Sequence, residues 1–86
     1  MHKVYRLERH FKKLELLYEA ELAKSKSSSA NLLFIRFEKL ERIRNRLNER
    51  FLCLTGGAYY RDFSISVENL SINLCQIIEY KFEFES

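Results

Sequence analysis

The residues whose side chains could do chemistry are few and scattered along the chain. His2 and His10 lie eight positions apart, whereas metal sites on helices use histidines four apart together with a third ligand. Cys53 and Cys75 have no neighbouring histidine or acid to activate a thiol, and no Cys-x-x-Cys is present. A small basic ribonuclease that pairs His10 with a glutamate is the best enzyme alternative, but no motif supports it. We therefore predict no metal, no cofactor and no enzymatic activity.

A glycine pair and a group of C-terminal acids are the remaining candidates. The pair Gly56-Gly57 lacks the Gly-x-x-x-x-Gly-Lys pattern of a phosphate-binding loop. Glu79, Glu83 and Glu85 occupy alternate positions near the end of the chain. Charges at alternate positions of a strand protect its edge against aggregation, which explains these acids better than acid–base catalysis does.

Basic residues form a stronger pattern. At about 100° per residue, each of two segments places a basic row beside an apolar seam and acidic residues on the other side. The row in the second segment consists of Arg36, Lys39, Arg42, Arg46 and Arg50. The row in the first segment consists of Lys3, Arg6, Arg9 and Lys13, with His2 and His10 among them. Antiparallel packing of the two segments is expected to bring both rows to one side of the molecule.

Two interpretations of this basic face remain open. Arginines four apart on a helix repel one another unless a partner neutralises them, and a polyanion such as DNA or RNA would do so. Alternatively, the face is solvated and is partly neutralised by the pairs Glu38–Arg42 and Arg46–Glu49, or it meets an acidic protein surface.

Two helices are predicted to position the basic rows. In residues 2–23, apolar residues recur three and four apart: Val4, Leu7, Phe11, Leu14, Tyr18 and Leu22. Residues 30–54 repeat this stripe with Leu33, Phe37, Leu40, Ile43, Leu47, Phe51 and Leu54. The polar segment 24–29 is predicted to be a loop, with Ser28 or Ser29 as the next N-cap. Gly56 suits the left-handed position after the second helix, and a short strand over 32–37 remains an alternative.

The last third of the chain alternates between apolar and polar residues. From residue 70, every second position reads Leu70, Ile72, Leu74, Gln76, Ile78, Tyr80, Phe82 and Phe84. This period predicts a β-hairpin over 58–85 that turns at Glu68-Asn69. The predicted fold is therefore α+β, an antiparallel two-helix hairpin followed by a C-terminal β-hairpin packed on it. A third helix over 70–85, giving an all-α fold, is the alternative.

Length and composition set the limits of these predictions. The 86 residues suit one small domain spanning 1–86, with 31% charged residues and a net charge of +3. Residues 1–54 contain 13 lysines and arginines against 7 glutamates, whereas the remainder is acidic. No apolar run approaches the ~20 residues of a membrane span, and no signal-peptide core is present at the N-terminus. We expect a cytoplasmic protein without membrane contact.

These observations predict a small non-enzymatic binding module. It is expected to be a homodimer that engages nucleic acid through the basic helical face. A protein–protein adaptor, inhibitor or assembly subunit docking on a larger partner is the alternative. Self-association is predicted to occur through strand edges or helix packing, using Tyr60, Ile77, Tyr80, Phe82 and Phe84.

Overall fold

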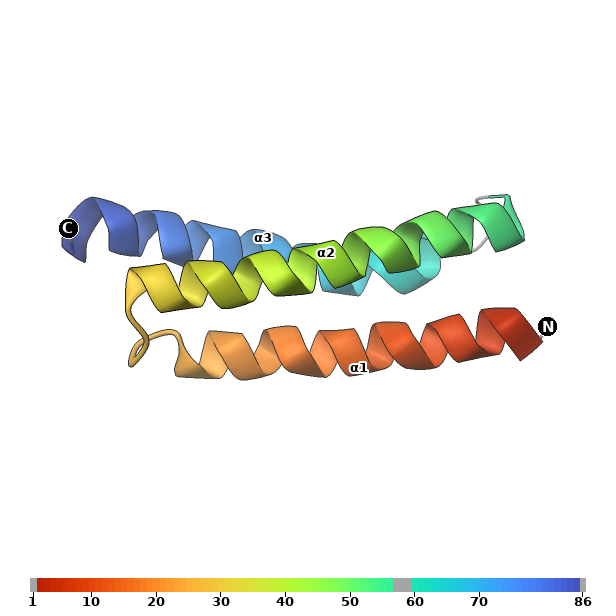
Figure 1. Ribbon diagram of the computed structural model, residues 1–86, viewed down its shortest axis with the longest axis horizontal. Helices are drawn as coiled ribbons and strands as arrows, with labels where there is room; N and C mark the ends of the chain where they lie inside the picture. The colour runs from red at the N-terminus through yellow and green to blue at the C-terminus, as the bar shows by residue number, and fades with distance from the viewer. Residues whose placement is uncertain (1, 57–59, 86) are drawn as a thin grey trace.

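The computed structural model describes residues 2–56 and 60–85, and they form three helices. These are α1 (His2–Lys24), α2 (Ala30–Thr55) and α3 (Tyr60–Glu85). Each helix runs antiparallel to the one before it, giving a rod of 47 × 17 × 17 Å (Figure 1). The C-terminal end of α3 reaches beyond the turn between α1 and α2 (Figure 1).

Helices α1 and α2 occupy the segments in which the sequence predicts helices. The N-cap of α2 is Ser29, whose side-chain oxygen accepts a hydrogen bond of 3.3 Å from the Leu32 amide. At the other end, Gly56 adopts the left-handed conformation with φ 63°, and its amide donates to the Leu52 carbonyl at 2.9 Å. Residues 32–37 are helical, so the alternative of a short strand there is wrong.

The predicted β-hairpin is wrong, because no strand occurs in the described residues and α3 is a continuous helix. Apolar residues in this segment recur both at alternate positions and at helical spacing. In the helix, Val67, Leu74 and Ile78 are buried against the other helices. Ile72 and Phe84, which the alternating pattern places on the buried face, are exposed. A helix also satisfies its own backbone hydrogen bonds, whereas an isolated two-stranded sheet is marginally stable. The α+β prediction is therefore replaced by its all-α alternative.

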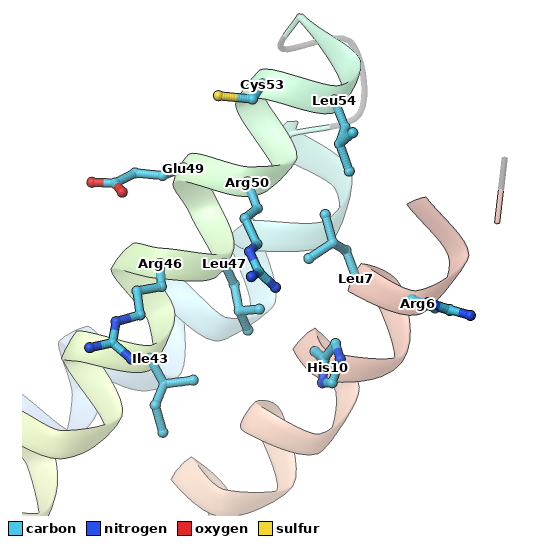
Figure 2. A pocket seen from close by; sticks show the side chains of 10 residues that line it. All are labelled: Arg6, Leu7, His10, Ile43, Arg46, Leu47, Glu49, Arg50, Cys53 and Leu54. Atoms are coloured by element: carbon cyan, nitrogen blue, oxygen red, sulfur yellow. The ribbon is translucent and has the colours of Figure 1, made fainter. Parts of the chain in front are cut away.

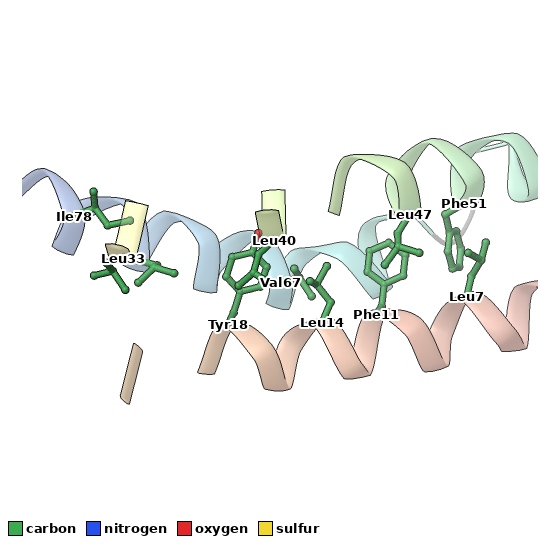
Figure 3. Close-up of a cluster of buried hydrophobic side chains, with 11 residues drawn as sticks. Leu7, Phe11, Leu14, Tyr18, Leu33, Leu40, Leu47, Phe51, Val67 and Ile78 are labelled. Atoms are coloured by element: carbon green, nitrogen blue, oxygen red, sulfur yellow. The ribbon is translucent and has the colours of Figure 1, made fainter. Parts of the chain in front are cut away.

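The core is a row of side-chain layers along the axis of the bundle (Figure 3). In α2, Leu33, Leu40 and Leu47 recur every seven residues, the spacing that keeps a seam facing nearly parallel neighbours. One layer pairs Phe11 with Phe51 edge to face, with ring centroids 5.7 Å apart. The buried core consists of Leu7, Phe11, Leu14, Tyr18, Leu33, Leu40, Leu47, Phe51, Val67, Leu74 and Ile78.

A polar cluster crosses the middle of this core and joins all three helices. Glu41 accepts hydrogen bonds from the Tyr18 hydroxyl at 2.9 Å, the Ser71 hydroxyl at 2.6 Å and Arg44 Nε at 2.6 Å. Burial raises the pKa of Glu41, but the bonds from Arg44, Ser71 and Tyr18 outweigh it and hold the pKa below its usual value. Burial and the neighbouring Glu41 raise the pKa of Tyr18.

Two cations hold the α1–α2 turn against the helices. Arg36 donates to Glu21 Oε1 and to the Ser28 hydroxyl, both at 2.7 Å. Lys81 of α3 is buried, and its ammonium donates to the Ser28 carbonyl at 3.0 Å. This end of the rod is therefore joined by contacts that are distant in sequence. None of the described helices is long and apolar enough to cross a membrane.

Candidate nucleic-acid interface

A groove runs between the N-terminal half of α1 and the C-terminal half of α2 (Figure 2). Its volume is about 900 Å³, and it is open to solvent along its length. Because α1 and α2 are antiparallel, the start of one lies beside the end of the other. The lining residues are Arg6, Leu7, His10, Ile43, Arg46, Leu47, Glu49, Arg50, Cys53 and Leu54.

The floor of the groove is apolar and its sides are basic. Leu7 and Leu47 belong to the buried core, and their outer atoms form the floor. Arg50 extends from α2 into the groove toward Leu7, and His10 faces α2 from the opposite side (Figure 2). The Arg6 side chain extends outward from the α1 rim (Figure 2). The groove therefore presents the Arg50 guanidinium over an apolar surface, with Arg6 on α1 and Arg46 on α2 at its outer edges.

The basic groups of the groove have no acidic partner among the described residues. Arg6, Arg46 and Arg50 are exposed and form none of the ion pairs found in residues 2–56 and 60–85. Glu49 is the acid among the lining residues, and it points away from the groove (Figure 2). The sequence suggested that Arg46 pairs with Glu49, but this ion pair is absent from the described residues. The positive charge of the groove is thus not neutralised internally.

The contact proposed between Glu38 and Arg42 is likewise absent from the described ion pairs. Arg42 is exposed and lies one helical turn before Arg46, and the exposed Lys39 lies two turns before it. The basic row on α2 therefore continues from the groove toward the middle of the rod.

On α1, Arg9 and Lys13 are exposed beside the groove residues. Lys13 follows Arg6 by seven positions and thus lies on the same face of the helix. The Lys3 side chain lies outside the described residues. Both predicted rows thus contribute members to one side of the molecule.

Arg36 does not belong with the groove, although the sequence places it in the basic row. It lies at the opposite end of α2, and its guanidinium is occupied by Glu21 and Ser28. His10, which the sequence places within the basic row of α1, lines the groove together with Arg6. The spacing of four between the two residues places them on the same side of α1.

Among the described side chains, the two thiols and His10 are not grouped into a metal-binding cluster. No group of three or more metal-binding side chains occurs within the residues that the structure describes. Burial, together with the nearby Glu79, raises the pKa of Cys75, which is the reverse of thiol activation. The Cys75 sulfur lies 3.6 Å from Glu79 Oε1. Cys53 is exposed at the edge of the groove, and its side chain points away from it (Figure 2).

Comparisons with protein-family models, with curated proteins and with solved structures found no match for this chain.

Proposed function

We propose that this chain is a small non-enzymatic binding protein whose α1–α2 face engages the phosphate backbone of nucleic acid. The observation that carries the proposal is the placement of Arg6, Arg46 and Arg50 around one groove, without ion pairs in the described chain and with Arg50 extending into the groove (Figure 2). The planar guanidinium donates in a fork that matches phosphate oxygens, and arginine is favoured wherever phosphate is bound.

The length of the basic row favours a repeating anion over a single one. From Lys39 to Arg50, α2 rises about 16 Å, and one strand of duplex DNA presents a phosphate about every 3.4 Å along its axis. Several phosphates of one strand can therefore lie along the row at the same time. Contacts of this kind give affinity without sequence recognition, since they involve no base edges. A cytoplasmic location is part of this proposal and accords with two free cysteines.

An acidic protein surface is the second candidate partner, and the apolar floor of the groove is the observation that favours it. An amphipathic helix with an apolar stripe and flanking acids would cover Leu7 and Leu47 and meet Arg46 and Arg50. In this case the chain would act as an adaptor or inhibitor on a larger partner.

Binding to a random-sequence DNA duplex and to a single-stranded RNA across a salt series tests the proposal. We expect log K to fall linearly with log salt, because bound phosphates release counterions. The double variant Arg46→Glu/Arg50→Glu should weaken binding by at least about tenfold and reduce the salt slope by about two. Fluorescence anisotropy of labelled nucleic acid provides the affinities.

The matched control is Lys12→Glu/Lys26→Glu, which changes the net charge by the same amount at exposed positions outside the groove. Its affinity should stay within a few-fold of the unmodified chain, and circular dichroism should report the same helix content for both variants. Equal losses in the two variants would show that net charge alone drives binding and would overturn the groove as its site. Absence of binding at the lowest salt would leave the acidic protein partner as the better candidate.

A further inference from the structure

Helix α3 carries two apolar stripes side by side, and the bundle uses one of them. The inner stripe faces α1 and α2 and includes Val67, Leu74 and Ile78. The second stripe, called the outer seam below, lies about 100° around the helix from it. It consists of Leu70, Asn73, Ile77, Tyr80 and Phe84. Its spacings of three, four, three and four are those of the a and d positions of a coiled coil.

The outer seam is largely uncovered. Leu70 and Ile77 are half-buried against the edge of the core, whereas Asn73 is exposed. Tyr80 and Phe84 are 61% and 65% exposed, which is unusual for two aromatic residues one turn apart. Their ring centroids lie 4.6 Å apart, so they form a single aromatic surface near the projecting end of α3.

A hollow in this seam has the geometry of a coiled-coil hole. Its volume is about 380 Å³, and it is lined by Asn73, Gln76, Ile77 and Tyr80. These are positions i, i+3, i+4 and i+7, the four residues that surround one inserted side chain in knobs-into-holes packing. The hollow opens on solvent, so the knob that fits it has to come from another helix.

The polar residues around the hollow indicate what kind of helix supplies the inserted side chain. The residues that line the hollow are uncharged, and two of them, Asn73 and Gln76, are exposed amides. Asn69 is a third exposed amide beside the seam, whereas the exposed acids Glu79 and Glu83 lie farther round the helix. An amide both donates and accepts hydrogen bonds, so two identical rims can pair without bringing like charges together. The nearby charges are acidic, which disfavours a polyanion on this surface. The surface is complementary to a copy of itself.

We propose that the outer seam of α3 is a dimer interface for a second copy of this chain, related by a two-fold axis. In this arrangement the same residues serve both partners, and a side chain of each α3 enters the hollow of the other. The pairing goes beyond the proposed binding function and does not depend on it, since the basic groove belongs to α1 and α2. Of the self-association residues predicted from sequence, Ile77, Tyr80 and Phe84 lie on this seam.

The other two predicted residues do not contribute to the seam in the same way. Phe82 is on the opposite flank of α3, where its ring lies edge to face with Phe34 of α2 at 6.0 Å. The Tyr60 side chain lies outside the described residues. The prediction of pairing through strand edges is wrong, because the described residues contain no strand.

Light scattering coupled to size exclusion, without nucleic acid, tests the interface. At tens of micromolar, the expected mass is twice the 10.4 kDa of one chain. The variant Tyr80→Glu/Phe84→Glu should elute as a monomer with unchanged helix content, because both side chains are exposed in the folded chain. The matched control Leu16→Glu/Leu52→Glu replaces residues that are 65% and 53% exposed on α1 and α2, and should remain dimeric.

A second variant tests the seam with a substitution that leaves the fold of the monomer intact. Asn73→Lys places a good helix former at an exposed helix position, so it should fold as well as the unmodified chain. In the dimer it places like charges in the seam and should raise the dimer dissociation constant by at least about tenfold. The same change at an exposed site on α2, Asn45→Lys, should have no such effect. A monomeric unmodified chain, or a dimer that survives both seam variants, would overturn the proposal.

Discussion

Glu41 is the residue on which all three helices converge. Its carboxylate accepts from Tyr18 on α1, from Arg44 on its own helix and from Ser71 on α3, at 2.6 to 2.9 Å. Apolar contacts tolerate small axial shifts of one helix along another, whereas these bonds are formed in one register. A hydrogen-bonded group in a core can fix alignment in this way. We infer that the cluster aligns the three helices along the rod axis.

The variant Glu41→Gln should lower the free energy of unfolding by about 1–2 kcal/mol at neutral pH, since it weakens charge-assisted hydrogen bonds and leaves Arg44 without its carboxylate. Because the pKa of Glu41 is lowered in the folded chain, its contribution is present above the unfolded pKa and is lost as the pH falls through the folded value. The difference between the variant and the unmodified chain should therefore shrink on acidification. Urea unfolding followed by circular dichroism at neutral and acidic pH measures it.

Glu38→Gln is the control for this change, because Glu38 is exposed on the same helix and forms no ion pair within the described residues. Its unfolding free energy should stay within about 0.5 kcal/mol of the unmodified chain. Equal stability of the two variants would show that the cluster contributes nothing.

At the scale of the elements, α1 and α2 could be predicted because a helical period runs through each segment, although residues 32–37 alone also fit a short strand. In α3 the two periods coincide, and local sequence does not choose between them. Leu74 and Ile78 fit both the alternating and the helical pattern. The two patterns differ at Ile72, which the alternating pattern buries and the helix exposes. The choice depends on the partner surface, because α1 and α2 offer a helical groove and no strand edge. This information is not present in residues 60–85 alone.

In the candidate site, likewise, some features follow from residue spacing within one helix and others depend on contacts between distant parts of the chain. The placement of Arg6, Arg46 and Arg50 around one groove follows from helical spacing and antiparallel packing, so the sequence predicts it. The involvement of Arg36 with Glu21, fifteen residues away, depends on the path of the turn and could not be read from spacing. For His10, the position on the basic row of α1 was predictable from spacing, but its proximity to α2 was not.

The N-terminus of α2 provides a test at this scale. Replacement of Ser29 by alanine removes the side-chain acceptor of the Leu32 amide and should lower the unfolding free energy by about 0.5–1 kcal/mol. Ser27→Ala is the matched control in the same turn, because its hydroxyl is exposed and donates only to the Lys24 carbonyl. Thermal unfolding of both variants measures the difference, and equal melting temperatures would contradict the role of Ser29 as the cap.

At the scale of the whole molecule, the basic groove and the outer seam lie on different helices. The basic groove lies over α1 and α2, while the outer seam on α3 holds amides and aromatic rings. The proposed nucleic-acid face and the proposed dimer seam therefore do not overlap. A net charge of only +3 is compatible with a strongly basic face, because residues 1–54 carry 13 basic against 7 acidic residues and the remainder of the chain is acidic.

The order of the helices along the chain also affects the rate of folding. Each helix packs against its neighbour in the chain through a short turn, so many contacts join residues that are close in sequence. Helical bundles of this topology fold within microseconds to milliseconds. The chain contains no proline, and a slow phase from peptide-bond isomerisation is therefore not expected. Refolding followed by rapid mixing or temperature jump should give one fast exponential for the monomer, and a phase lasting seconds at low protein concentration would contradict this expectation.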